Sequence, residues 1–170
     1  MNTDSIILGG GCFWCLDAMY KRVDGVTAII AGYAGGEIPN PTYEQVCGGR
    51  TGHAEVIKLE FNANVVSLEV LLRIFFEIHD PTTLNQQGGD VGTQYRSVVY
   101  FKDNEQRALI EKIRDEAQLN WKNQIVTEIK PLENFYPAED YHQDYYAKNP
   151  NQPYCVAVIS PKLEKFLKKH

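Results

Sequence analysis

The chain has 170 residues, of which 44% are hydrophobic, and this is enough for one buried core, so we expect a single domain over residues 1–170. The formal net charge of −5 argues against a nucleic-acid-binding surface, and no apolar run is long enough for a membrane span. The four cysteines are too few and too irregular for a secreted disulfide scaffold. These properties predict a soluble cytoplasmic protein without a nucleic-acid or membrane partner.

A glycine turn near the amino end separates a short strand from a helix. The apolar run 5–8 predicts the strand, three glycines follow it, and residues 13–21 are predicted to form the helix. Cys12 stands at the helix start, where free backbone N–H groups and the helix dipole favour a thiolate. We therefore identify Cys12 as the candidate nucleophile, with Phe13 and Trp14 as apolar walls beside it.

A strand is predicted over 53–61, after a strand over 26–33 and a long irregular segment over 38–52. Its alternation places Glu55 on the same side as three apolar residues, Ile57, Leu59 and Phe61. A carboxyl group on an apolar face tends to keep its proton, which suits it to donating that proton. The alternative is that Glu55 lies at the strand end, paired with arginine or with backbone.

The remaining helices and strands are predicted from the spacing of apolar residues and from the glycine, proline and capping residues that bound them. The pattern predicts a helix capped by Ser67 that stops at His79, an irregular segment over 84–96, a strand over 97–101, a helix from Asp103 towards Ala117, a strand over 125–129, a strand over 155–159 and a final helix from Ser160. Tyrosines are interleaved with acidic and amide residues after residue 132, so we expect 132–170 to wrap around the body. Strands and helices without strict alternation favour an α+β fold in which helices pack on a mixed or antiparallel sheet.

Six segments carry a resemblance to a known family. In chain order they are Gly11-Cys12-Phe13-Trp14, Gly32-Tyr33-Ala34-Gly35-Gly36, Pro39-Asn40-Pro41-Thr42-Tyr43, Gly52-His53-Ala54-Glu55, Gly92-Thr93-Gln94-Tyr95-Arg96-Ser97 and Phe135-Tyr136-Pro137-Ala138-Glu139-Asp140-Tyr141-His142-Gln143. The chain resembles a peptide methionine sulfoxide reductase of type A. The resemblance implies a two-layer ferredoxin-like sandwich with long loops that carry the site. It also implies reduction of the S epimer of methionine sulfoxide in oxidised proteins and peptides.

The resemblance also assigns roles to residues. It implies attack on the sulfoxide sulfur by Cys12, proton donation to the sulfoxide oxygen by Glu55, hydroxyl donors at Tyr43 and Tyr95, a water-organising carboxylate at Asp90, and a pocket for the substrate methyl group at Phe13 and Trp14. It implies no bound cofactor or metal, and thioredoxin as the external reductant. A sulfenic acid at Cys12 would then condense with a second thiol to a disulfide.

The identity of that second thiol stays open between three cysteines, and the absence of any resolving cysteine is the remaining alternative. Cys155 follows the aromatic segment, and family members commonly resolve from the carboxy-terminal region. Cys15 is the rival, because its spacing from Cys12 permits a local disulfide. Cys47, in a glycine-rich loop, is the third candidate.

Two other function classes remain as alternatives. A thiol-disulfide oxidoreductase would use Cys12 and Cys15 alone, and its reaction would give Glu55 no role. A zinc module would use all four cysteines, although such sites usually show two close pairs and only one is present. The histidines are dispersed without ligand spacing, at positions 53, 79, 142 and 170.

Overall fold

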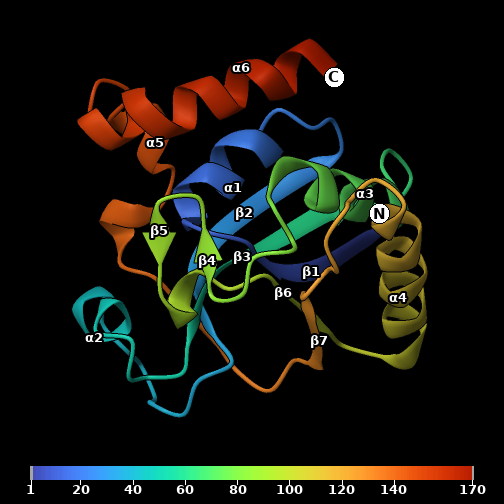
Figure 1. Cartoon of the computed structure of the whole chain (residues 1–170), viewed down its shortest axis with the longest axis horizontal. Coiled ribbons are helices and arrows are strands. Elements are labelled where there is room, and N and C mark those ends of the chain that lie inside the picture. Colours follow the sequence, from blue (N-terminus) through green and yellow to red (C-terminus); the bar gives the residue numbers. More distant parts are fainter. Residues whose placement is uncertain (1, 170) are drawn as a thin grey trace.

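A ferredoxin-like arrangement forms the centre of the computed structural model, which describes residues 2–169, so that Met1 and His170 lie outside it. In chain order its elements are β1 (Thr3–Gly9), α1 (Phe13–Tyr20), β2 (Val26–Ala34), β3 (Ala54–Asn62), α3 (Leu68–Ile78) and β6 (Val98–Phe101). The four strands lie in the order β6-β1-β3-β2, and every neighbouring pair is antiparallel. The α+β sandwich with packed helices is confirmed (Figure 1).

Two short strands extend this sheet at its edges. β7 (Glu128–Pro131) pairs in parallel with β6, and β8 (Phe135–Pro137) pairs antiparallel with β2, so the sheet is mixed. β7 begins three residues after the start predicted from the sequence. The backbone N–H of Val126 donates to Pro81 O at 2.8 Å, and the Thr127 hydroxyl bonds to that of Ser97 at 2.7 Å. These residues are therefore held by neighbouring loops before the strand starts.

The two faces of the sheet bury different residues. Ile57, Leu59 and Phe61 face the larger core, which contains residues of α1, α3 and of α4 (Asn104–Gln118). Val56, Val98 and Tyr100 belong to a smaller cluster on the other face. Because alternate strand residues point to opposite faces, the start of β3 is buried on both sides, and Glu55 is the one charged side chain among its first four residues.

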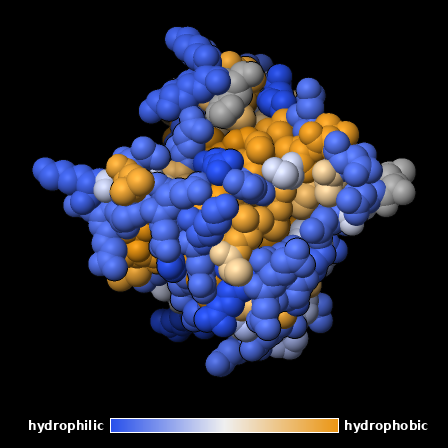
Figure 2. All heavy atoms as spheres, turned by 90° about the vertical axis from the view of Figure 1, so that its right-hand side faces the viewer, coloured by the Kyte–Doolittle hydropathy of each residue, from blue (hydrophilic) through white to orange (hydrophobic). Residues whose placement is uncertain are grey.

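The predicted caps of the two long helices are confirmed. The Ser67 hydroxyl accepts from the Val70 N–H at the start of α3, and the Asp103 carboxylate accepts from the Gln106 N–H at the start of α4. α3 and α4 pack together, on the side of the molecule that Figure 2 turns towards the viewer, where apolar atoms lie between hydrophilic ones.

The carboxy-terminal segment differs from the sequence prediction. The strand expected over 155–159 is wrong, because Cys155–Ile159 form a π-helical turn that continues into α6 (Ser160–Lys169). Cys155, Ile159, Leu163 and Phe166 are all buried, and their spacing of three or four residues places them on one helical face. This face packs on α1, and the contact outweighs the strand preference of the valine- and isoleucine-rich run (Figure 1).

Short elements give order to the two segments predicted to be irregular and to part of the segment predicted to wrap around the body. They are α2 (Tyr43–Cys47), β4 (Gln86–Gln87), β5 (Asp90–Val91), the 3₁₀ turns η1 (Thr93–Tyr95) and η2 (Asp140–His142), and α5 (Tyr145–Lys148). Within residues 2–169, no helix combines the length and the apolar character needed to cross a membrane.

Candidate active site

The turn before α1 places Cys12 at the amino end of the helix. Gly11 has a φ of +86°, and a Cβ built there would lie 2.7 Å from Cγ of Gln87, so this position requires glycine. The Gly11 N–H donates to Tyr95 O at 3.2 Å, which fixes the turn against η1. Cys12 follows as the N-cap residue of α1. The turn therefore brings the loop that carries Tyr95 next to the cysteine.

Glu55 is buried beside this helix start, with only 1% of its surface exposed. It lies on β3 opposite Tyr33 of β2, and its Oε1 accepts a hydrogen bond from the Phe13 N–H at 3.3 Å. Its Oε2 is buried without a hydrogen-bond partner. Burial raises the pKa of Glu55 to about 8, and the Phe13 N–H lowers that pKa only in part. The carboxyl group thus lies on the core face, has a backbone partner, and is protonated at neutral pH.

The Cys12 thiol is also buried, with 8% of the residue exposed. Burial raises its pKa well above the ordinary value, and the nearby Glu55 carboxylate raises it further. The hydrogen bond from the backbone of Trp14 lowers the pKa but does not outweigh these two effects. The expectation that the helix start favours a thiolate is therefore wrong for the resting protein. Cys12 and Glu55 form a buried pair in which both groups keep their protons.

Tyr43 and Tyr95 lie close enough to Glu55 for ionisation of its carboxyl group to affect them. Burial raises the pKa of each phenol, and the Glu55 carboxylate adds to the rise. Both phenols therefore remain hydrogen-bond donors at neutral pH. Asp90 belongs to the same cluster, because its charge raises the pKa of Glu55. The structure therefore brings Tyr43, Asp90 and Tyr95, from the two segments predicted to be irregular, together around the Cys12 and Glu55 pair.

Aromatic contacts fix the two residues that follow Cys12. The Trp14 indole stacks on Tyr145 with ring centroids 3.8 Å apart and an interplanar angle of 7°. Its Nε1–H donates to Nδ1 of His142 at 3.1 Å. Phe13 is fully buried, and its ring centroid lies 5.8 Å from that of Tyr33 and 5.2 Å from that of His142. Together these rings form a rigid apolar wall beside the cysteine.

Three supporting residues come from the carboxy-terminal segment and were not assigned a role from the sequence. Glu139 accepts from the Tyr33 hydroxyl and from the Tyr43 N–H, both at 3.0 Å, and so ties α2 to β2. His142 holds Trp14, and the Tyr154 hydroxyl donates to Oδ2 of Asp90 at 2.6 Å. The signals in the sequence were the interleaving of aromatic and polar residues after residue 132 and, for Glu139 and His142, their place in the segment 135–143 that carries the resemblance.

The remaining cysteines occupy three different environments. Cys15 is buried on the first turn of α1, with its Sγ 4.0 Å from the Tyr154 hydroxyl. Cys47 is exposed at the end of α2, and Cys155 is fully buried against the core. Burial alone raises the pKa of Cys155, whereas the Glu55 charge adds to the rise for both Cys15 and Cys47. Cys155 is therefore the cysteine that lies apart from the charged groups of the site.

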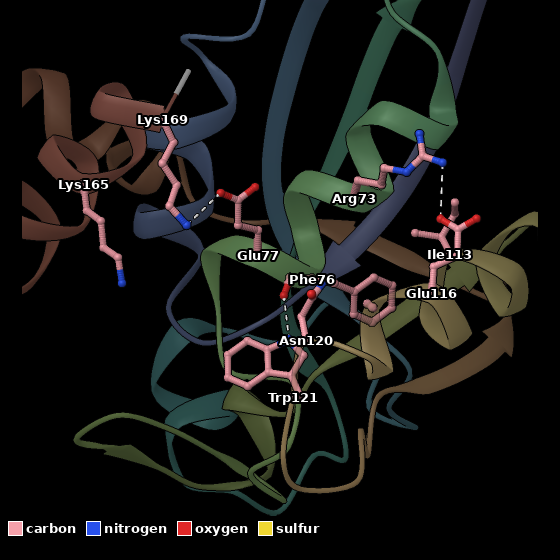
Figure 3. A pocket seen from close by; sticks show the side chains of 10 residues that line it. Arg73, Phe76, Glu77, Ile113, Glu116, Asn120, Trp121, Lys165 and Lys169 are labelled. Carbon is pink, nitrogen blue, oxygen red and sulfur yellow. Dashed lines mark hydrogen bonds and ion pairs between the residues drawn. The ribbon is translucent and has the colours of Figure 1, made fainter.

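All four thiols are free, and across residues 2–169 no group of three or more potential ligands is arranged to hold a metal ion. A cavity of about 580 Å³ lies between α3, α4 and α6. Figure 3 shows the ion pairs at its rim, Lys169 with Glu77 and Arg73 with Glu116. None of the residues that line this cavity is a predicted site residue, so the cavity is separate from the cluster around Cys12.

Comparison with known proteins gives consistent matches. The family model described as peptide methionine sulfoxide reductase matches residues 4–170. A relative from Nautilia profundicola, peptide methionine sulfoxide reductase MsrA, is 59% identical over 162 residues, which cover 95% of this chain and 93% of the relative. Reduced Mxr1 from Saccharomyces cerevisiae has a similar structure, with a TM-score of 0.85 at 43% identity, covering 89% of this chain and 88% of Mxr1. Mxr1 in complex with Trx2 matches with a TM-score of 0.62 at 32% identity, covering 85% of each chain.

Proposed function

This chain belongs to the peptide methionine sulfoxide reductase family, and we propose that it reduces the S epimer of methionine sulfoxide, in oxidised proteins and peptides and as the free amino acid, to methionine. The full-length family match and the sulfoxide reductase names of the relatives support the activity. We further propose that residues 1–170 act as one reductase domain in the cytoplasm, where free thiols persist.

The reaction begins at the Cys12 and Glu55 pair. Protonated Glu55 donates its proton to the sulfoxide oxygen, which makes the sulfoxide sulfur electrophilic, and the Cys12 sulfur attacks it. The oxygen then passes to the Cys12 sulfur: the sulfur–oxygen bond of the substrate and the transient sulfur–sulfur bond both break, methionine leaves, and Cys12 becomes a sulfenic acid. The thiol proton replaces the one that Glu55 gave up. A sulfoxide and a thiol thus become a thioether and a sulfenic acid.

The surrounding residues orient the substrate. Tyr43 and Tyr95 donate hydrogen bonds to the sulfoxide oxygen, and Asp90 organises water beside it. Phe13 and Trp14 hold the substrate methyl group against an apolar wall that excludes water. The shared electrostatic influence of Glu55 on the two phenols supports this arrangement.

A second thiol completes the cycle. The Cys12 sulfenic acid condenses with the Cys155 thiol, which releases water and leaves a disulfide. A thioredoxin dithiol then reduces that disulfide, so the protein needs no bound cofactor. The solved complex of Mxr1 with Trx2 supports a reductant of this kind. Cys15 and Cys47 remain the alternative partners, because both lie nearer to the charges of the site.

The single observation that carries the proposal is the buried, protonated Glu55 next to the helix start at Cys12. The test is methionine formation from a blocked S sulfoxide with dithiothreitol as reductant. We expect turnover by the parent protein and by Cys47→Ser, and none by Cys12→Ser. Disulfide reduction by a parent protein that produces no methionine would support the dithiol oxidoreductase alternative.

A further inference from the structure

Tyr154 stands directly before Cys155, yet its side chain contacts the candidate active site. Its hydroxyl donates to Oδ2 of Asp90 at 2.6 Å and lies 4.0 Å from Sγ of Cys15. Its ring meets the Trp14 indole edge-on, with centroids 5.8 Å apart. All three partners belong to the site or flank the nucleophile, so this tyrosine anchors the start of the π-helical turn to the site.

The thiol of Cys155 has the opposite placement. It is fully buried in the core formed with α1 and α6, and its pKa responds to burial alone. Charges at Cys12 and Cys15, in contrast, add to the raised pKa of Tyr154. The Tyr154 hydroxyl therefore lies at the site, beside Asp90 and Cys15, whereas the Cys155 thiol lies in the core.

A disulfide requires the Cα atoms of its two cysteines to lie about 4.4–6.8 Å apart. Cys12 and Cys155 are both free thiols, so their sulfurs have to approach to about 2 Å for a disulfide to form. We expect this approach to shift the π-helical turn and to move Tyr154, which leads it. The hydrogen bond to Asp90 resists this shift, because a bond to a carboxylate is stronger than one between neutral groups. A π-helical turn is a rare conformation that occurs often at functional sites.

We propose that the hydrogen bond between Tyr154 and Asp90 is a latch that holds Cys155 away from Cys12 until Asp90 is engaged in the reaction. The latch rests on the proposed function, in which Asp90 belongs to the substrate site and Cys155 is the resolving thiol. Tyr154 is thus a positioning residue. Release of its hydroxyl from Asp90 frees the turn, and Cys155 condenses with the Cys12 sulfenic acid, forming one sulfur–sulfur bond and releasing one water molecule.

The first test measures how accessible Cys155 is in the fully reduced protein. Iodoacetamide is added, and alkylation of each cysteine is followed by peptide mass spectrometry, with exposed Cys47 as the internal reference. We expect Tyr154→Phe to speed the alkylation of Cys155 about tenfold, which corresponds to the loss of one charge-assisted hydrogen bond. This readout requires no sulfoxide and no turnover.

The matched control is Tyr146→Phe, which removes a hydrogen bond of 2.7 Å to Ser160 within the same carboxy-terminal segment but away from Asp90. We expect it to leave the alkylation of Cys155 close to the parent rate. An equal acceleration in both variants would mean general loosening of the segment and would overturn the latch. An unchanged rate in Tyr154→Phe would overturn it as well.

A second test separates the latch from the proposed function. Hydrogen peroxide converts Cys12 to a sulfenic acid without any methionine sulfoxide, and the Cys12–Cys155 disulfide is then quantified over time. We expect the disulfide in the parent protein and faster formation in Tyr154→Phe. Formation of the disulfide at the same rate in the parent protein and in Tyr154→Phe would contradict the latch. Absence of the disulfide from both proteins would contradict the choice of Cys155 as resolving thiol and remove the basis of the latch.

Discussion

Glu55 and Phe13 are joined by a hydrogen bond of 3.3 Å from the backbone N–H of Phe13 to the buried carboxyl oxygen of Glu55. This bond connects the third residue of the Gly-Cys-Phe-Trp segment to the middle of the sheet, 42 residues away. It places the acid at the helix start that also holds Cys12. The proton donor and the nucleophile are therefore fixed by the same turn.

The pH dependence of sulfoxide reduction follows from the raised pKa of Glu55. We expect the rate of a single turnover to fall as pH rises through about 8, because the protonated carboxyl group is lost there. Glu55→Gln removes the acid, so we expect a rate lower by about 10²–10⁴ and no fall near that pH. Methionine formed by reduced protein in rapid-quench experiments between pH 6 and 9.5 measures both effects. An equal fall near pH 8 in Glu55→Gln would contradict the role of the acid.

The same pKa predicts how stability changes with pH. The pKa of Glu55 rises from 4.5 to about 8 on folding, so the folded state holds a proton that the unfolded state loses between these values. The free energy of unfolding contributed by this group is fully present below pH 4.5 and declines as pH rises towards 8. A difference of one bound proton between the folded and unfolded states changes the free energy of unfolding by about 1.4 kcal/mol per pH unit. We expect urea denaturation of Glu55→Gln to lack this decline between pH 5 and 7.

Asp17 offers a matched comparison for that measurement. Burial raises its pKa from 3.8 to about 6, and one of its oxygens accepts a hydrogen bond from the Asp144 N–H at 3.1 Å. Its contribution to the free energy of unfolding therefore declines from pH 4 to pH 6 and is constant above that range. We expect Asp17→Asn to alter the slope only in this lower window. A changed slope between pH 6.5 and 8 in Asp17→Asn would contradict this assignment.

The left-handed backbone at Gly11 predicts a strict requirement for glycine. A side chain there meets Gln87 and forces a strained φ, so we expect Gly11→Ala to lower the free energy of unfolding by about 1–3 kcal/mol. Displacement of Cys12 also lowers the rate of sulfoxide reduction, by about tenfold or more. Gly89→Ala is the control, because a Cβ at Gly89 meets no heavy atom within 4 Å. Denaturant unfolding of both variants checks the prediction, and equal stabilities would contradict it.

The assignment of Cys155 as the resolving cysteine predicts which variants turn over with thioredoxin as the reductant. We expect Cys155→Ser to form one methionine per protein at the parent rate, because the first step uses Cys12 alone. With thioredoxin we expect its steady-state turnover to fall at least about tenfold, since no intramolecular disulfide forms. Cys15→Ser and Cys47→Ser should retain turnover with thioredoxin. Retained turnover in Cys155→Ser, with loss in one of the other two, would move the resolving role to that cysteine.

The role of burial at Glu55 could be predicted from the sequence because the signal is local. Alternation along one strand placed the carboxylate among apolar residues, and the structure buries it there. The strand predicted at 155–159 was wrong because a five-residue apolar run does not distinguish a strand from a buried helical turn. Its contact with α1 decides the conformation, and that contact is not visible in the run itself.

The remaining features of the site depend on contacts between distant parts of the chain. His142 bonds to Trp14 across 128 residues, and Tyr154 bonds to Asp90 across 64 residues. The protonation of Cys12 was predicted wrongly for a related reason. The helix start that favours a thiolate is visible in the sequence, whereas the burial and the Glu55 charge that outweigh it arise only on folding.

The most direct measurement compares the separated S and R epimers of a blocked methionine sulfoxide as substrates for the reduced parent protein, Cys12→Ser and Glu55→Gln. Cys12 and Glu55 acting together predict methionine from the S epimer alone, no product with Cys12→Ser, and a strongly slowed reaction with Glu55→Gln. Equal consumption of both epimers, or full activity of Glu55→Gln, would contradict a mechanism in which the buried carboxyl group protonates an oriented sulfoxide.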